Sequence, residues 1–405
     1  MKDILITNGR IIGLEGIIPN GSLSVSNGVI TGIYAGDQRQ PKEDEIAIDV
    51  GGKYISPGFI DIHLHGGGGY DFMAADPQQV MDCCKMHMKH GTTSLVPTTC
   101  SADHERFIKA MDNISQARTS MKDGPCILGM HLEGPYFAMN QRGAQPANAI
   151  RNPDPNEYME IVGRFGNILR WSVAPELSGA MEMARELVPR GIRMSIGHSD
   201  ALFEEAVNAY ECGFTTVTHL YSCTSTVRRV NAYRKAGIIE AAFLLDDMMV
   251  EIIADGRHLP SSLLKLIYKI KGPDRICLVS DALSVAGLNG IQGEIYSQTN
   301  DGMIIIEDDV AKLPDRSAFA GSVATTDRLV RTMVTEADVP LFQAVKMMSA
   351  TPAKNIGVFE KKGSLAIGKD ADILIFDEDI KINMVLVGGE ITFNDLQKVD
   401  YLLPD

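Results

Sequence analysis

Short apolar runs that each end on a histidine or a carboxylate recur along this chain of 405 residues. The polar residues at their ends are His63 and His65, Glu133, His198, His219 and Asp281. Short strands without polar alternation are typical of parallel sheets that are covered on both faces. When such a sheet closes into a barrel, the carboxyl ends of its strands meet at one face, and catalytic side chains come from several strands. The pattern therefore predicts an enzyme whose active-site residues lie far apart in the sequence.

The segment from residue 56 to residue 355 alternates such strands with helical patterns. The expected strands are 55–62, 93–97, 126–133, 169–175, 191–198, 214–219, 248–254 and 276–280. The helical patterns between them include 77–90, 103–119, 158–165, 180–189, 201–212 and 261–271. Alternation of this kind predicts parallel β/α units. Eight strands in roughly 300 residues favour a closed barrel over an open sheet, so we expect an α/β protein with a (β/α)8 TIM-like barrel.

The two ends of the chain, 1–55 and 356–405, have a different pattern. Short strands separated by Asn-Gly or Gly-Gly turns are expected at 4–7, 17–18, 22–25, 29–34 and 46–49, and again at 371–376, 384–387 and 390–393. Neither piece has enough apolar residues for a core of its own. We therefore expect one small β-sandwich domain that is built from both termini.

Charge and composition narrow the class of partner. The formal net charge is −14 and no basic stripe is present, which argues against nucleic acid. No apolar run approaches the length of a membrane-spanning helix, and the first residues lack the pattern of a signal peptide. Seven cysteines without Cys-x-x-Cys spacing are typical of reduced core thiols. These features predict a soluble cytoplasmic protein that acts on a small molecule, with no membrane or nucleic-acid partner.

Five of these polar residues have side chains of the kind that bind a catalytic metal. Residues two apart on a strand face the same way, so the imidazoles of His63 and His65 can share a cation. Such a pair is a weak signal by itself, because strand histidines also satisfy core hydrogen bonds. Glu133, His198 and His219 add three more ligands, and three protein ligands with an open fourth position are typical of a catalytic zinc-type site. The sequence predicts one or two divalent cations, zinc first, with iron, manganese and cobalt as alternatives.

Other polar residues have expected supporting roles. Asp281 can take a proton from a metal-bound water and deliver it to a leaving amine. His258, in the loop after the seventh strand, is expected to steady a substrate carbonyl or hydroxyl, with an ordinary surface histidine as the alternative. His131 and Asp61 are expected to support the ligands or to make structural hydrogen bonds. The remaining histidines, which lie on expected outer helices and are predicted to face solvent, are His87, His90 and His104.

A basic cluster follows the strand that ends at His219. It comprises Arg228, Arg229, Arg234 and Lys235 in an otherwise acidic chain. Arginine binds phosphate and carboxylate groups with paired hydrogen bonds. The cluster is therefore either an anion-binding site or a solvated loop.

Longer motifs around these residues indicate a family resemblance. They are Pro57-Gly58-Phe59-Ile60-Asp61-Ile62-His63-Leu64-His65-Gly66, His131-Leu132-Glu133-Gly134-Pro135, Gly197-His198-Ser199, Thr218-His219-Leu220-Tyr221, Ala254-Asp255-Gly256-Arg257-His258, Val279-Ser280-Asp281-Ala282 and Ala320-Gly321-Ser322. With them the chain resembles the N-acetylglucosamine-6-phosphate deacetylases of the amidohydrolase superfamily almost from end to end. The His-Leu-Glu-Gly-Pro segment is the most specific motif, because most relatives carry a carboxylated lysine in place of the glutamate.

The resemblance implies roles for individual residues. It implies metal ligation by Glu133, His198 and His219, with Asp281 as acid and base. Some family members lack the pair His63 and His65 and use one metal, so the presence of the pair leaves one or two metal sites as the alternatives. It also implies a homodimer in which an arginine of the partner subunit reaches the sugar phosphate. Arg234 is the best match for that arginine, with Arg228 and Arg229 as substitutes. The residues expected to bind the substrate are Ala144, Gln145, Ser222, Cys223, Arg234, His258 and Ser322.

Two positions in the expected sugar pocket depart from the family pattern. Gln145 stands where the family commonly has histidine, and Ser222 stands where it commonly has asparagine. A polar pocket discriminates strongly when its hydrogen-bonding groups change. The sequence therefore predicts the type of reaction more firmly than it predicts which sugar is the substrate.

The leading hypothesis is hydrolysis of the N-acetyl amide of an amino-sugar phosphate, N-acetylglucosamine 6-phosphate, to glucosamine 6-phosphate and acetate. One alternative is deacetylation of a different N-acyl amino sugar. Another is a cyclic-amide hydrolase of the dihydroorotase or hydantoinase type, which the absence of a lysine at the end of the fourth strand disfavours. A third is a non-catalytic barrel, which the presence of every expected ligand disfavours.

Overall fold

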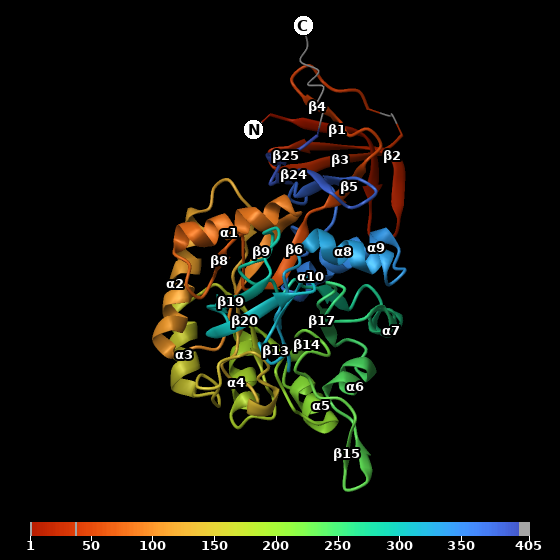
Figure 1. Cartoon of the computed structure of the whole chain (residues 1–405). Helices are drawn as coiled ribbons and strands as arrows, with labels where there is room; N and C mark the ends of the chain where they lie inside the picture. Colours follow the sequence, from red (N-terminus) through yellow and green to blue (C-terminus); the bar gives the residue numbers. More distant parts are fainter. Residues whose placement is uncertain (1, 37–38, 397–405) are drawn as a thin grey trace.

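The computed structural model describes residues 2–36 and 39–396. It has two parts, a barrel surrounded by helices and a smaller sheet stacked on one end of it (Figure 1). Among the described residues, every helix is too short or too polar to span a lipid bilayer.

The barrel consists of eight parallel strands, and the expected (β/α)8 fold is confirmed. In neighbour order the strands are β6 (Phe59–Leu64), β9 (Thr92–Thr99), β11 (Met130–Glu133), β12 (Ile168–Val173), β13 (Arg193–Ile196), β14 (Phe214–Val217), β17 (Met249–Ile252) and β18 (Ile276–Leu278), with β10 (Cys126–Ile127) pairing to β9. The first and last strands meet just beyond their carboxyl ends. There the backbone N–H of Asp281 donates to the carbonyl of His63 over 2.9 Å, and that of His65 donates to Ala282 over 2.8 Å.

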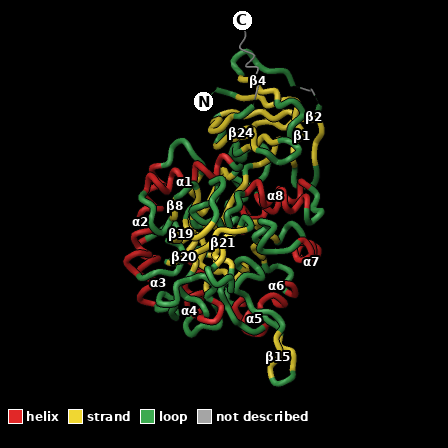
Figure 2. The backbone as a smooth tube through the Cα atoms, in the orientation of Figure 1, coloured by secondary structure: helices red, strands yellow, loops and turns green. Residues whose placement is uncertain are grey.

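Helices surround the barrel strands (Figure 2). Six lie where the sequence predicts them: α1 (Pro77–Lys89), α2 (His104–Ser120), α3 (Pro155–Arg164), α4 (Ala180–Leu187), α5 (Phe203–Glu211) and α7 (Ser261–Lys271). Side-chain caps explain the sharp starts, because Asp76 and Asp103 each accept a hydrogen bond from a backbone N–H of the first helical turn. The remaining helices, which the sequence patterns did not separate, are α6 (Ile238–Leu244), α8 (Thr326–Thr335), α9 (Leu341–Met348) and α10 (Ala350–Asn355), with 3-10 turns at Met139–Gln141 and Val188–Arg190.

The small domain is one hydrogen-bonded sheet with strands from both ends of the chain. Its members are β1 (Ile4–Ile12), β2 (Ile17–Ser26), β3 (Val29–Ala35), β4 (Ile46–Asp49), β5 (Tyr54–Pro57), β23 (Ile373–Phe376), β24 (Ile382–Val387) and β25 (Glu390–Asn394). The two ends join where β23 pairs antiparallel with β5, with Ile373 opposite Pro57. Their apolar side chains share one core, which includes Ile6, Ile48 and Met384. The predicted strands 17–18 and 22–25 are parts of β2.

The single strand predicted at 55–62 is wrong, because the structure divides it between the two sheets. Residues up to Pro57 belong to β5, and the barrel strand begins at Phe59. Gly58 lies at the junction, where a Cβ atom would stand 2.0 Å from Oγ1 of Thr93. The apolar run is continuous in sequence, so only the packing of the two sheets reveals the break.

Three insertions that follow barrel strands form antiparallel strands that the sequence patterns did not predict, and one of them carries the basic cluster. A hairpin of β15 (Arg228–Val230) and β16 (Tyr233–Lys235) follows β14 and projects away from the small domain (Figure 1). A four-stranded antiparallel sheet follows β18 and comprises β19 (Gly293–Ser297), β20 (Gly302–Glu307), β21 (Val310–Lys312) and β22 (Phe319–Gly321). A short ribbon of β7 (Gly66–Gly67) and β8 (Tyr70–Asp71) follows β6.

The prediction that His87 faces solvent is wrong. Its side chain is fully buried on the inner face of α1, and its Nε2 atom lies 2.8 Å from the carbonyl oxygen of Gly66. The imidazole thus connects α1 to β7, the short strand that follows His65. Burial lowers the pKa of His87 to about 4, so the ring is neutral at neutral pH. The side chains of His90 and His104 are 35% and 42% exposed.

The buried ring of His87 should make stability depend on pH. Because its pKa is lower in the folded state than in the unfolded chain, the unfolded state binds the extra proton between about pH 6.5 and pH 4. Stability should therefore fall as the pH drops through this window, by up to about 3 kcal/mol from this residue. His87→Gln should flatten the pH dependence of the urea midpoint, whereas His104→Gln should leave it unchanged. Parallel curves for His87→Gln and the unmodified chain would refute this assignment.

Candidate active site

The predicted strand-end residues converge at one face of the barrel. His63 lies in β6 and Glu133 ends β11, while His65, His198, His219 and Asp281 follow their strands by one to three residues. Three of them have left-handed backbone angles, with φ of 46° at His198, 27° at His219 and 48° at Asp281. Such angles are costly for residues other than glycine and cluster at functional sites.

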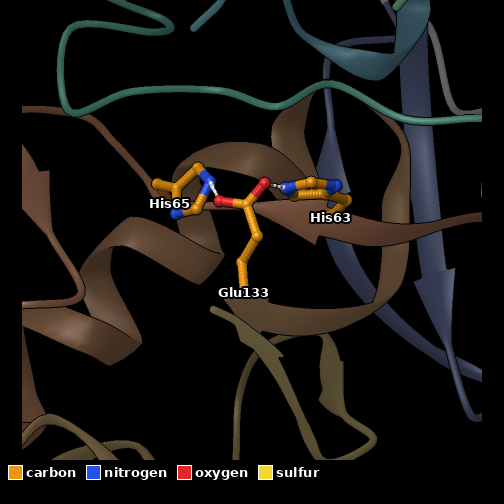
Figure 3. Close-up of side chains that lie close together, drawn as sticks. All are labelled: His63, His65 and Glu133. Atoms are coloured by element: carbon orange, nitrogen blue, oxygen red, sulfur yellow. Dashed lines mark ion pairs between the residues drawn. The ribbon is translucent and has the colours of Figure 1, made fainter. Parts of the chain in front are cut away.

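Glu133 is the centre of the cluster, and Figure 3 shows its carboxylate between the rings of His63 and His65. Oε1 lies 3.0 Å from Nε2 of His219, 3.2 Å from Nε2 of His198 and 3.4 Å from Nε2 of His63. Oε2 lies 3.3 Å from Nε2 of His65. Four imidazoles thus direct the same ring atom at one buried carboxylate.

The hydrogen bonds behind the rings leave acceptors facing one another in this cluster, an arrangement that suits a cation site. Nδ1 of His198 lies 3.0 Å from the carbonyl of Gln141, and Nδ1 of His219 lies 3.1 Å from the carbonyl of Ser222. A carbonyl only accepts, so both Nδ1 atoms carry hydrogen, and in the neutral rings both Nε2 atoms are acceptors. These two Nε2 atoms are 3.2 Å apart and both face the Glu133 carboxylate. Acceptors that face acceptors in a buried site are stable only around a positive charge.

The same attraction for positive charge acts on the other two rings. Burial opposes a charge on His63, but the attraction of Glu133 and Glu251 outweighs it and raises the pKa to about 10. For His65, hydrogen bonds to Asp281 and Glu133 outweigh burial and raise the pKa to about 9. A divalent cation would satisfy this attraction in place of protons.

The cluster contains two groups with metal-ligand spacing, and they share Glu133. One is His63, His65 and Glu133, and the other is Glu133, His198 and His219; within each, the ligand atoms lie within 4.8 Å of one another. Imidazole and carboxylate ligands suit zinc, iron, manganese and cobalt. The donor set therefore fits one or two catalytic cations.

Asp281 borders the cluster on the side of the His-x-His pair. Its Oδ1 lies 3.2 Å from Nε2 of His65 and 3.6 Å from Nε2 of His63. Burial opposes its charge, but the hydrogen bond from His65 and the nearby rings hold its pKa below the ordinary value. Asp281 is thus an ionised carboxylate that can accept a proton at neutral pH.

Two buried charged residues belong to the site although no motif indicates them. Glu251, in β17, places Oε2 3.0 Å from Nδ1 of His63. Arg170, in β12, forms an ion pair with Glu251 inside the barrel. Each lies within a run whose pattern predicts an apolar strand. A single charged residue inside an apolar strand was therefore the only sequence feature that could have indicated either of them.

His131 and Asp61 make structural contacts. Nε2 of His131 lies 2.7 Å from Oγ of Ser172, and its ring packs edge-on against that of His63 with centroids 4.6 Å apart. Burial lowers the pKa of His131 well below its ordinary value, so its ring is neutral. Oδ1 of Asp61 accepts backbone hydrogen bonds from His63 over 3.2 Å and Ser280 over 3.4 Å.

A pocket of about 570 Å³ opens above the cluster. The expected substrate residues that line it are Ala144, Gln145, Ser222, Cys223 and His258. Its outer wall includes Asn300 and Phe319 of the inserted sheet, which sequence patterns did not assign to the site. Nδ1 of His258 lies 2.8 Å from Oδ2 of Asp255.

Gln145 contacts the carboxylate at the centre of the cluster. Its Nε2 donates to Oε2 of Glu133 over 2.7 Å, and its Oε1 accepts from the backbone N–H of Ser101 over 2.9 Å. The amide is therefore engaged on both sides. Its first role is to orient Glu133.

Two of the residues that were expected to bind the substrate do not line the pocket. Ser322 is fully buried behind Asp281, its backbone N–H donates to the Asp281 carbonyl over 2.9 Å, and it is not among the residues that line the pocket. In this structure Ser322 supports the Asp281 segment, and its direct contact with a sugar stays a prediction. Arg234 is exposed on the projecting hairpin and does not line the pocket of its own chain.

The fold, the ligand cluster and the aspartate beside it define a metal-dependent hydrolase built on a (β/α)8 barrel. The chain belongs to the amidohydrolase family, whose family model matches residues 54–392. It is 30% identical to the N-acetylglucosamine-6-phosphate deacetylase of Bacillus subtilis over 97% of this chain and 98% of that protein.

Solved structures show the same relationship. The N-acetylglucosamine-6-phosphate deacetylase of Pasteurella multocida aligns with a TM-score of 0.89 at 27% identity, covering 97% of this chain and 100% of that one. A mutant of the Mycobacterium smegmatis deacetylase, with an aspartate changed to alanine and in complex with N-acetyl-D-glucosamine-6-phosphate, aligns with a TM-score of 0.87 at 27% identity and the same coverage.

Replacing the central carboxylate should abolish metal binding. In Glu133→Gln the shared anionic ligand is lost, while four imidazoles still converge on the position. We expect metal content after dialysis, measured by elemental analysis, to fall close to zero. Glu157→Gln makes the same chemical change on α3 outside the cluster and should keep the full metal content. Full metal content in Glu133→Gln would contradict the ligand assignment.

Proposed function

We propose that the chain hydrolyses the N-acetyl amide of N-acetylglucosamine 6-phosphate to give glucosamine 6-phosphate and acetate. The observation that carries this proposal is the convergence of Glu133, His198 and His219 on one point beside Asp281, beneath a sugar-sized pocket. The named activity of the relatives and of the similar structures supports the substrate.

Glu133, His198 and His219 would hold one divalent cation, zinc first, and His63 and His65 with Glu133 would hold a second. A cation there acidifies a bound water and polarises the amide carbonyl. Asp281 takes the proton of the attacking water on its carboxylate and then delivers it to the departing amine. Nδ1 of His258 donates to Oδ2 of Asp255, which orients the ring and leaves Nε2 to contact a substrate hydroxyl.

A different N-acyl amino sugar is the second candidate. Ser222 lines the pocket with a short hydroxyl where the family commonly has asparagine, and the amide of Gln145 is engaged by Glu133. Both observations concern recognition of the sugar, and they leave the position of Asp281 beside the cluster unchanged.

Acetate release tests the proposed reaction. The metal-loaded protein should release acetate from N-acetylglucosamine 6-phosphate faster than from unphosphorylated N-acetylglucosamine, and it should not open cyclic imides. Asp281→Asn should lower turnover by about 100- to 10,000-fold, because the acid/base group is lost, while metal content stays unchanged. Turnover by Asp281→Asn at the unmodified rate would exclude its assigned role. Absence of acetate release from both sugars would exclude the proposed function.

We further propose that the protein acts as a homodimer in the cytoplasm. All seven cysteines are free, which agrees with a reducing compartment. Among the described residues that line the pocket, Arg142 is the only arginine or lysine, and its Nη1 donates to the carbonyl of Gln145 over 2.8 Å. A sugar phosphate would therefore gain from a second arginine. The exposed hairpin with Arg234 can supply one to the pocket of a second copy.

Mixed dimers test the contribution of Arg234. Arg234→Gln and Asp281→Asn should each be impaired alone, whereas co-expressed heterodimers should regain activity, because one site then has both an intact Asp281 and an arginine from the partner. Arg190→Gln, another exposed arginine, should keep activity by itself. If the heterodimers show no more activity than the two homodimers, Arg234 does not act across subunits.

A further inference from the structure

Glu251 is a fully buried carboxylate directly behind the ligand cluster. Its Oε2 lies 3.0 Å from Nδ1 of His63 and 3.3 Å from the backbone nitrogen of His219. Its other side forms the ion pair with Arg170, whose side chain is 1% exposed. One carboxylate thus contacts residues from both metal-ligand groups.

A buried ion pair in a barrel interior carries a large desolvation penalty. Removing two charges from water often costs more than their mutual attraction returns, and apolar side chains of similar size fill such space at lower cost. Because the Glu251–Arg170 pair is neutral as a unit, it does not balance the charge of the cluster. Its distinctive feature is the hydrogen bond that it makes to a ring of the cluster.

That hydrogen bond fixes the state of the His63 ring. A carboxylate only accepts, so Nδ1 of His63 carries a hydrogen, and in the neutral ring the lone pair is then on Nε2, which lies 3.4 Å from Oε1 of Glu133. This is the tautomer that a metal ligand requires. A carboxylate behind the ring also makes the ring nitrogen a stronger donor to a metal.

His63 differs in this respect from the other rings of the cluster. Backbone carbonyls hold His198 and His219, and Nδ1 of His65 has no hydrogen-bond partner among the described residues. Asp61 is also near His63, but its hydrogen bond there is to the backbone N–H of His63 and not to the ring. Glu251 is therefore the anionic side chain that acts on an imidazole from behind.

We propose that Glu251, neutralised by Arg170, is a positioning residue that fixes the ring of His63 in the orientation and tautomer of a metal ligand. Glu133, His198 and His219 would hold one cation, and Glu133, His63 and His65 would hold the other. The inference rests on the proposed metal-dependent function and adds to it the residue that prepares the second cation position. Loss of Glu251 should weaken the second position most, because the rings of His198 and His219 keep their own hydrogen bonds.

Zinc titration of the metal-free full chain against a competing chelator tests the proposal. The unmodified protein should bind two zinc ions. Glu251→Gln should weaken one site by about 10- to 100-fold and leave the other unchanged. Asp61→Asn is the matched control, since it replaces a buried carboxylate beside His63 that does not contact the ring, and it should keep both affinities. Two unchanged sites in Glu251→Gln, or an equal loss in Asp61→Asn, would overturn the proposal.

The single substitution leaves Arg170 as an unpaired buried charge and can prevent folding. The double variant Arg170→Gln with Glu251→Gln removes both charges and should show the same selective loss of one zinc site in a protein with native circular dichroism. Retention of both affinities in the double variant would overturn the proposal. A single zinc site in the unmodified chain would also overturn it and leave the deacetylase function intact, whereas absent acetate release with two zinc sites would remove only that function.

Discussion

The structure depends on one electrostatic constraint, the convergence of hydrogen-bond acceptors on a single buried point that attracts positive charge. Glu133 supplies the carboxylate, and imidazoles from separate strands supply nitrogen lone pairs around it. A barrel meets this constraint because the carboxyl ends of its strands form a ring of fixed size. His198, His219 and Asp281 have left-handed backbone angles, which are unfavourable for these residues and are held in place by the packing of the site.

The atoms behind the ligands complete the site. Backbone carbonyls accept hydrogen bonds from the rings of His198 and His219, and the buried carboxylate of Glu251 accepts one from the ring of His63. The side-chain amide of Gln145 donates to Glu133 itself. The barrel interior thus sets tautomers and ring orientations before any ligand arrives. The inserted sheet after β18 closes the outer wall of the pocket, so the scaffold provides the chemistry and an insertion helps to shape the substrate space.

Much of this arrangement could be predicted from the sequence. Strands that end on polar residues predicted the barrel and the convergence of these residues at one face, because the strand ends of a parallel barrel lie together. Glu251 and Arg170 escaped prediction because each is one charged residue within an apolar run. The burial of His87, the break at Gly58 and the bond between Gln145 and Glu133 depend on tertiary contacts that have no local signal. The hairpin that carries Arg234 read only as a basic loop.

The most direct test of the central claim is a crystal structure of the metal-replete protein with anomalous scattering measured at the absorption edge of the bound metal. The account predicts an anomalous peak about 2.0–2.2 Å from Oε1 of Glu133 and from Nε2 of His198 and His219. Unchanged positions of these side chains, with only water between them and no anomalous signal, would contradict it.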